Sequence, residues 1–131
     1  FATAGRGTLR TIDPKSYSRY DSLVLTVTSI DVSRLAQIYK TIKPRLNEAY
    51  QKNGHPNGNV DRAVQQALDV LLATPVVKDP IGLVEGDGAR WAYADPKLES
   101  LEPSQKQLLR MGSAHVDALR VWLRALQNAI A

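Results

Sequence analysis

The sequence has 131 residues, with 17 lysines and arginines against 13 aspartates and glutamates, which gives a formal net charge of +4. This length is typical of one domain, and a content of 44% hydrophobic and 23% charged residues is typical of a soluble globular fold. The absence of cysteine excludes a disulfide scaffold, a thiolate nucleophile and a cysteine-ligated metal site, and two isolated histidines offer little to a transition metal. We therefore expect neither a metal nor a cofactor.

Residues 1–12 are small, polar and without hydrophobic period, which predicts a flexible tether followed by a single helical domain over residues 13–131. Asp13 and Pro14 are typical of a helix start, and Ile12 can contact Tyr17 across the first turn. A helix is therefore expected from residue 14 onward. The apolar residues that follow recur at three- and four-residue steps, although part of the run also alternates like a strand.

Two further helices are predicted in the first half of the chain. Asp31 is a candidate cap for the clearest periodic segment, which ends at Asn53 and Gly54. Pro44 lies within this segment and lacks the amide that would bond to the preceding turn, so the helix should kink or restart there. Asn59 is a candidate cap for the next helix, which should stop before Thr74 and Pro75.

The second half of the chain predicts one hairpin and two helices. Apolar residues alternate on both sides of the turn sequence at 85–88, which is typical of a β-hairpin. Pro103 should open a short helix that ends at Gly112 in a left-handed conformation, and Ser113 should cap the last helix. The fold class is therefore mainly α, with about five helices in a compact bundle and one β-hairpin. The predicted core consists of Leu35, Ile38, Ile42, Leu46, Leu68, Leu71, Leu108, Val116, Leu119, Trp122 and Leu126.

The charge is distributed unevenly. Residues 1–52 carry nine basic and four acidic side chains, whereas residues 79–102 carry two basic and six acidic ones. Basic side chains beside an apolar helical stripe either form a solvated rim or bind an anionic partner. A nucleic-acid reader would show a denser basic stripe or a known motif, so we expect no nucleic acid and favour a partner protein or an anionic membrane surface. The candidate binding residues are Arg34, Lys40, Arg45 and Lys52 on the second helix, Arg90 and Trp91 on the hairpin, and Arg110.

Three carboxylates are the best candidates for acid and base chemistry. Asp95, Glu99 and Glu102 lie close together in sequence, as a small glycan- or peptide-processing hydrolase would require. Carboxylates at helix starts are more commonly caps. No serine or glycine motif of a known catalytic class is present, so we assign no catalytic residue and expect a protein that is not an enzyme.

The chain resembles a bacterial family known as domain of unknown function 3014. The likeness spans residues 17 to about 128 and is carried by the blocks RYD (19–21), YKTIKP (39–44), NEAY (47–50), LLATP (71–75), ADP (94–96), LESL (98–101) and KQLLRMG (106–112). One departure follows Gly112, where the family usually has Pro-Glu-Asn and this chain has Ser113, Ala114 and His115. The resemblance implies a domain that follows an amino-terminal membrane anchor and a low-complexity linker, on the periplasmic face of the inner membrane. It implies no activity, cofactor or catalytic residue.

Together these observations predict a non-enzymatic protein-interaction module of a membrane-anchored envelope protein. The partner is an unidentified envelope protein or an anionic surface. The hydrolase is the alternative, and self-association into a homo-oligomer through the helical faces is a third possibility.

Overall fold

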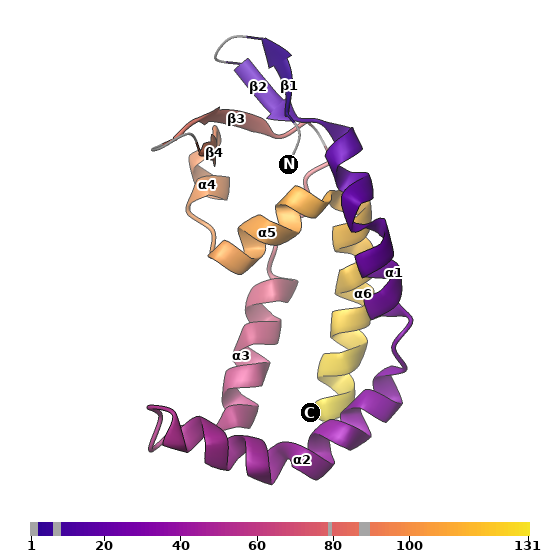
Figure 1. Cartoon of the computed structure of the whole chain (residues 1–131), viewed down its shortest axis with the longest axis vertical. Coiled ribbons are helices and arrows are strands. Elements are labelled where there is room, and N and C mark those ends of the chain that lie inside the picture. The colour runs from indigo at the N-terminus through magenta and orange to yellow at the C-terminus, as the bar shows by residue number, and fades with distance from the viewer. Residues whose placement is uncertain (1–2, 7–8, 79, 87–89) are drawn as a thin grey trace.

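The computed structural model describes residues 3–6, 9–78, 80–86 and 90–131 (Figure 1). In chain order its elements are β1 (Thr3–Arg6), β2 (Leu9–Ile12), the 3-10 helix η1 (Pro14–Tyr20), α1 (Asp21–Thr28), α2 (Val32–Lys52), α3 (Val60–Leu72), β3 (Gly82–Glu85), β4 (Trp91–Tyr93), α4 (Pro96–Glu99), α5 (Pro103–Met111) and α6 (Ser113–Ile130). The mainly α fold expected from the sequence is confirmed.

The helices pack around α6, which contacts α1, α2, α3 and α5. Figure 1 shows the sheet at one end of the molecule and α2 crossing the opposite end. The predicted basic helix and the predicted hairpin are therefore far apart. Among the described residues, no helix combines the length and apolarity needed to cross a membrane.

The sheet has four antiparallel strands in the order β1-β2-β3-β4. The expected hairpin is present as β3 and β4, in which Leu83 pairs with Tyr93, while its tip at 87–89 lies outside the described residues. Strands β1 and β2 occupy the segment expected to be a flexible tether, so that expectation is wrong for 3–6 and 9–12. The reason is a long-range contact: Arg10 pairs with Leu83, and Ile12 is only 2% exposed beneath the sheet.

The local capping signals were informative. Asp13 Oδ1 accepts a hydrogen bond from the Lys15 amide at 2.9 Å, but the expected first helix begins as η1 and becomes α-helical only at Asp21. Helix α2 continues through Pro44 without restarting. Ser113 is the first residue of α6 rather than its cap, because Gly112, with φ of +96°, supplies the corner.

The hydrophobic core has three clusters. The first lies beneath the sheet, and its buried members are Ile12, Ile81, Leu83, Tyr93 and Leu109. The second joins α1, α5 and α6 through Val24, Leu108, Met111, Val116 and Leu119. The third joins α2, α3 and α6 through Ala36, Leu68 and Ile130. Of the predicted core, Leu68, Leu108, Val116 and Leu119 are buried and Leu35, Leu71, Trp122 and Leu126 are half-buried.

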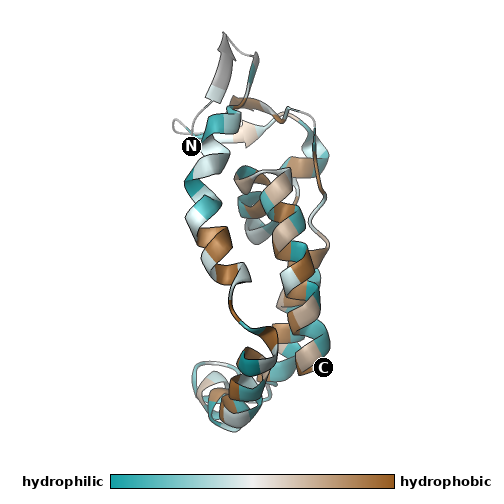
Figure 2. Cartoon of the chain, turned by 90° about the vertical axis from the view of Figure 1, so that its right-hand side faces the viewer, coloured by the Kyte–Doolittle hydropathy of each residue, from teal (hydrophilic) through white to brown (hydrophobic). Residues whose placement is uncertain are grey.

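Three predicted core residues on α2 are instead exposed. Ile38, Ile42 and Leu46 are 51%, 42% and 38% exposed. Helix α2 meets the body through the side that carries Ala36 and Tyr39. At about 100° per residue, the centre of that side lies roughly 130° around the helix from Ile38, 90° from Ile42 and 50° from Leu46, which is the order of their exposure. Figure 2 shows hydrophobic residues along α1 and α6 as well as in α2 at the foot of the molecule, so hydropathy alone does not reveal which of them are covered.

Candidate interaction surface

Helix α2 is held firmly on the body by its inner side. Tyr39 donates a hydrogen bond to Asp61 Oδ1 at 2.8 Å, and Lys43 Nζ lies 3.8 Å from the same oxygen. Burial and the neighbouring carboxylate of Asp61 raise the pKa of Tyr39 to about 12. Asn47 Oδ1 accepts from the Val60 amide at 2.9 Å, which ties α2 to the start of α3. The rotation of α2 about its own axis is therefore fixed.

This orientation turns an apolar row outward. Ile38, Ile42 and Leu46, here called the α2 stripe, follow one another at four-residue intervals and span about 12 Å along the helix. Single exposed hydrophobic residues are ordinary, but three large aliphatic side chains in one row form a continuous patch. The α2 stripe is therefore a candidate docking surface.

Cationic side chains run beside the α2 stripe. Arg34, Arg45 and Lys52, here called the basic flank, lie on the helix within about 40° of Ile38. All three are exposed, and none makes an ion pair within the described part of the chain. Glu48 is an exposed acidic neighbour farther round the same flank. The predicted binding residue Lys40 is also exposed, but it lies about 160° from Ile38 and does not join this surface.

The two hairpin candidates lie at the other end of the molecule from α2. Trp91 is half-buried against the cluster beneath the sheet, with the Arg10 guanidinium 5.8 Å from its ring centroid. Arg90 is exposed, and it lines a hollow of about 380 Å³ with Glu85, Gly86 and Trp91. Trp91 thus contributes mainly to packing, and the structure does not bring the hairpin pair together with the basic flank.

Arg110 belongs to a polar cluster between β4, α4 and α5. Glu99 accepts hydrogen bonds from the Tyr93 amide at 2.8 Å and from Lys106 Nζ at 3.0 Å. These two contacts, in that order, hold the pKa of Glu99 below its ordinary value, and the Arg110 charge adds a smaller effect. The buried Tyr93 hydroxyl donates to the Lys106 carbonyl at 2.9 Å. Arg110 therefore lies at a structural junction, close enough to Glu99 for its charge to act on that carboxylate.

The other two candidate catalytic carboxylates are caps. Asp95 Oδ1 accepts from the Lys97 amide at 2.9 Å at the start of α4. Glu102 and Gln105 form a capping box at the start of α5. A general acid needs a raised pKa, whereas that of Glu99 is lowered. None of these contacts favours the hydrolase alternative.

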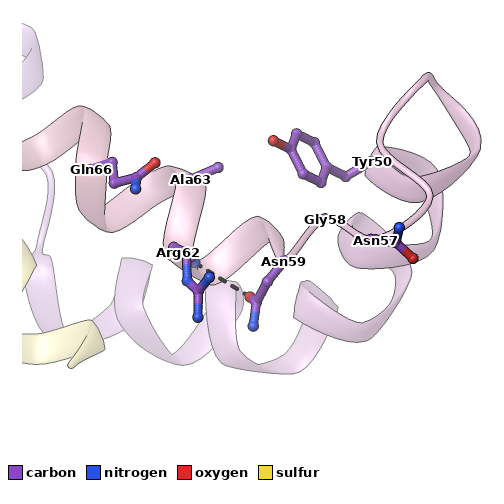
Figure 3. Close-up of a pocket in the computed structure, with 7 residues that line it drawn as sticks. All are labelled: Tyr50, Asn57, Gly58, Asn59, Arg62, Ala63 and Gln66. Carbon is purple, nitrogen blue, oxygen red and sulfur yellow. Dashed lines mark hydrogen bonds between the residues drawn. The ribbon is translucent and has the colours of Figure 1, made fainter.

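A polar hollow lies where α2 turns into α3 (Figure 3). It measures about 350 Å³ and is lined by Tyr50, Asn57, Gly58, Asn59, Arg62, Ala63 and Gln66. The Tyr50 ring stacks on His55 with centroids 4.2 Å apart, and Figure 3 shows it facing Ala63 across the hollow. Sequence reasoning missed this site because Tyr50 falls on the apolar period of α2. Within the described residues, no group of three metal-ligating side chains lies close enough to hold a metal ion.

Comparison with known proteins identifies a family. A profile of the family described as "Protein of unknown function (DUF3014)" matches residues 1–127, which is nearly the whole chain. No curated protein and no solved structure matches the chain. The chain therefore belongs to the DUF3014 family, as the sequence blocks indicated.

Proposed function

We propose that this domain is a non-enzymatic protein-interaction module that docks another protein on the outer face of α2. The observation that carries the proposal is the α2 stripe with the basic flank beside it. Three large aliphatic side chains stay 38–51% exposed, next to three cations that make no ion pair within the described residues. Apolar contact surrounded by charge is the usual composition of a protein interface.

The apolar part of this face is large enough to matter for binding. Fully burying a side chain of this size stabilises by about 1.5–3 kcal/mol. Because the three side chains are between 38% and 51% exposed, covering the remainder supplies roughly 2–4 kcal/mol in total. That contribution alone gives only weak binding, so the cations must contribute to affinity or to partner choice.

The total surface of the chain is large for its mass. Its accessible surface is 8742 Å², whereas folded monomers of 14.4 kDa average about 6,800 Å². An elongated shape with a sheet at one end and α2 at the other accounts for the large surface (Figure 1).

The proposal includes an envelope location, on the periplasmic face of the inner membrane and tethered through a segment outside this chain. Its support is the resemblance of the sequence blocks to the DUF3014 family, which implies an anchored domain. Fractionation of cells that express the full-length gene product is the test: recovery in the membrane fraction, with the domain open to protease only after the outer membrane is breached, is expected. Recovery in the cytosolic fraction would overturn the location.

Charge reversal with a matched control tests the docking face. The triple variant R34E/R45E/K52E removes the basic flank, while K15E/R19E/K40E makes the same change in net charge at exposed cations elsewhere. In affinity capture from envelope extracts, we expect the first variant to lose captured protein at least tenfold and the second to retain it. Equal capture by both variants would contradict the proposal.

A further inference from the structure

We infer that the occupant of the α2 face is an acidic amphipathic helix of a partner protein. This inference rests on the proposed function and names the class of partner that the same surface fits. Four properties of α2 lead to it: the sign of its charge, the spacing of its apolar residues, the burial of its inner flank, and the like charges that would face each other if a second copy bound there.

Charge complementarity sets the sign of the partner. The basic flank presents three exposed cations on one side of the α2 stripe, and Glu48 is the acidic residue beside them. Apposed like charges are costly at an interface, whereas complementary potentials steer and orient association. A segment with carboxylates along one edge therefore fits, and a basic or neutral segment does not.

The spacing of the apolar residues favours a helix. The α2 stripe repeats once per turn, so a partner helix can place its own apolar side chains between these residues along the same axis. The basic flank extends from Arg34 to Lys52, which is about 27 Å of helix. A partner helix of about 18 residues could follow this length with carboxylates on one edge.

The inner flank of α2 argues against a lipid surface. Helices that lie in a membrane interface present a broad apolar face, commonly with aromatic residues, and cations along the polar side. Here the aromatic residue Tyr39 is turned inward and bonded to Asp61, and Ala36 is buried against α3 and α6. The exposed row is narrow and purely aliphatic, which suits one helix better than a bilayer.

A second copy of the chain fits less well. In an antiparallel pairing of two α2 helices across a two-fold axis, each flank meets the same flank of the other copy. The basic flanks would then face each other. Self-association through this surface is therefore disfavoured by like charge.

Mapped photo-crosslinking tests the inference. A photo-reactive amino acid replaces Ile42 in the full-length protein, expressed in the organism that encodes it, and the crosslinked peptide is sequenced by mass spectrometry. A matched probe at Val121, which is 74% exposed on α6, is the control. We expect Ile42 to crosslink a segment with apolar residues at helical spacing and at least three carboxylates on one edge, and R34E/R45E/K52E to reduce the yield at least tenfold. Replacing the carboxylates of the partner segment with lysine should restore the crosslinking yield of R34E/R45E/K52E.

The outcomes separate the inference from the proposed function. Crosslinks from Ile42 to a partner segment without an acidic edge, to lipid or to a second copy overturn the acidic helix. Crosslinks to a protein of any kind still leave a protein docking on α2. An absence of protein crosslinks from Ile42, or crosslinks from Ile42 to the same proteins and in the same yield as from Val121, overturns both.

Discussion

Glu99 joins β4, α4 and α5 through one carboxylate, and it also protects a sheet edge. Strand β4 is at the edge of the sheet, and its Tyr93 amide points away from β3 toward Glu99 Oε2. Unpaired amides on an edge strand invite pairing with other chains. Glu99 therefore has a structural role, although its place in the acidic segment made it a candidate for catalysis.

Replacing Glu99 with glutamine tests this role. Because its pKa is lowered in the folded protein, its contribution to stability is present above the ordinary carboxyl pKa of 4.5 and is lost as pH falls through the lower folded value. The side chain is 43% exposed, so solvent screening limits the cost of E99Q at pH 7 to about 1 kcal/mol. Urea denaturation at pH 7, 5 and 3 should show the two proteins converging at the lowest pH. A constant gap would contradict this account.

Gly112 illustrates a backbone requirement. Its φ is +96°, and a Cβ there would lie 2.7 Å from Tyr17 Cγ, whereas Gly54 has nearly the same φ of +97° with nothing within 4 Å. Both alanine variants incur backbone strain of about 1–3 kcal/mol, and only G112A adds a clash. We expect G112A to lower the free energy of unfolding by at least about 2 kcal/mol more than G54A. Similar losses of stability in both variants would show that the Tyr17 ring or the backbone moves to relieve the clash.

At the scale of elements, a contact between α6 and α1 fixes the first helix on the bundle. His115 Nε2 lies 2.7 Å from Asp21 Oδ1 and 3.1 Å from the Tyr17 carbonyl. Both neighbours accept hydrogen bonds, so this nitrogen carries the proton. Trp122 Nε1 donates to the Ile30 carbonyl at 3.0 Å near the other end of α1. Helix α1 is thus attached at both of its ends by side chains from α6.

A double-mutant cycle with D21N and H115A measures the first of these contacts. Asp21 is 66% exposed, so we expect a coupling energy of about 0.5–1 kcal/mol, as for other solvent-screened pairs. The free energies of unfolding of the wild type, both single variants and the double variant provide it. Strict additivity would mean that the pair contributes no stability.

Single residues of the α2 stripe should contribute less to the free energy of unfolding than a residue of the core. Because each of these side chains is about half exposed, replacing any one of Ile38, Ile42 and Leu46 with serine leaves no internal cavity, and we expect each single variant to lose less than about 1.5 kcal/mol. Leu68 is 6% exposed in the adjoining cluster, and L68A should lose about 2–5 kcal/mol. Thermal and urea unfolding provide the comparison. A loss in each single variant as large as that of L68A would show that the stripe is buried.

At the scale of the whole molecule, features that depend on neighbouring residues could be predicted from the sequence, and features that depend on contacts between distant residues could not. Asp31 and Asn59 cap α2 and α3 as expected because such caps involve only neighbouring backbone amides. Strands β1 and β2 were missed because β2 is completed by β3, about 70 residues later in the chain. Periodicity likewise found the apolar face of α2 but could not show that the body covers only its Ala36 side.

The same distinction applies to the candidate site. Sequence reasoning placed Arg34, Lys40, Arg45 and Lys52 on one helix, and the structure keeps three of them, Arg34, Arg45 and Lys52, together and exposed on one flank. It grouped them with Arg90 and Trp91, which the fold puts at the opposite end (Figure 1). It also assigned Ile42 to the core, although its outward position is what makes the basic flank a candidate interface.

Cysteine labelling tests the central claim most directly, because the chain contains no native cysteine. Single variants I42C and V121C, the latter on α6, are treated with a maleimide reagent as purified protein and within the cells of origin. The account predicts that both react readily when purified and that only I42C becomes at least fivefold slower in the cell, where the partner covers α2. Equal rates for the two variants in the cell, or an unreactive I42C in the purified protein, would contradict it.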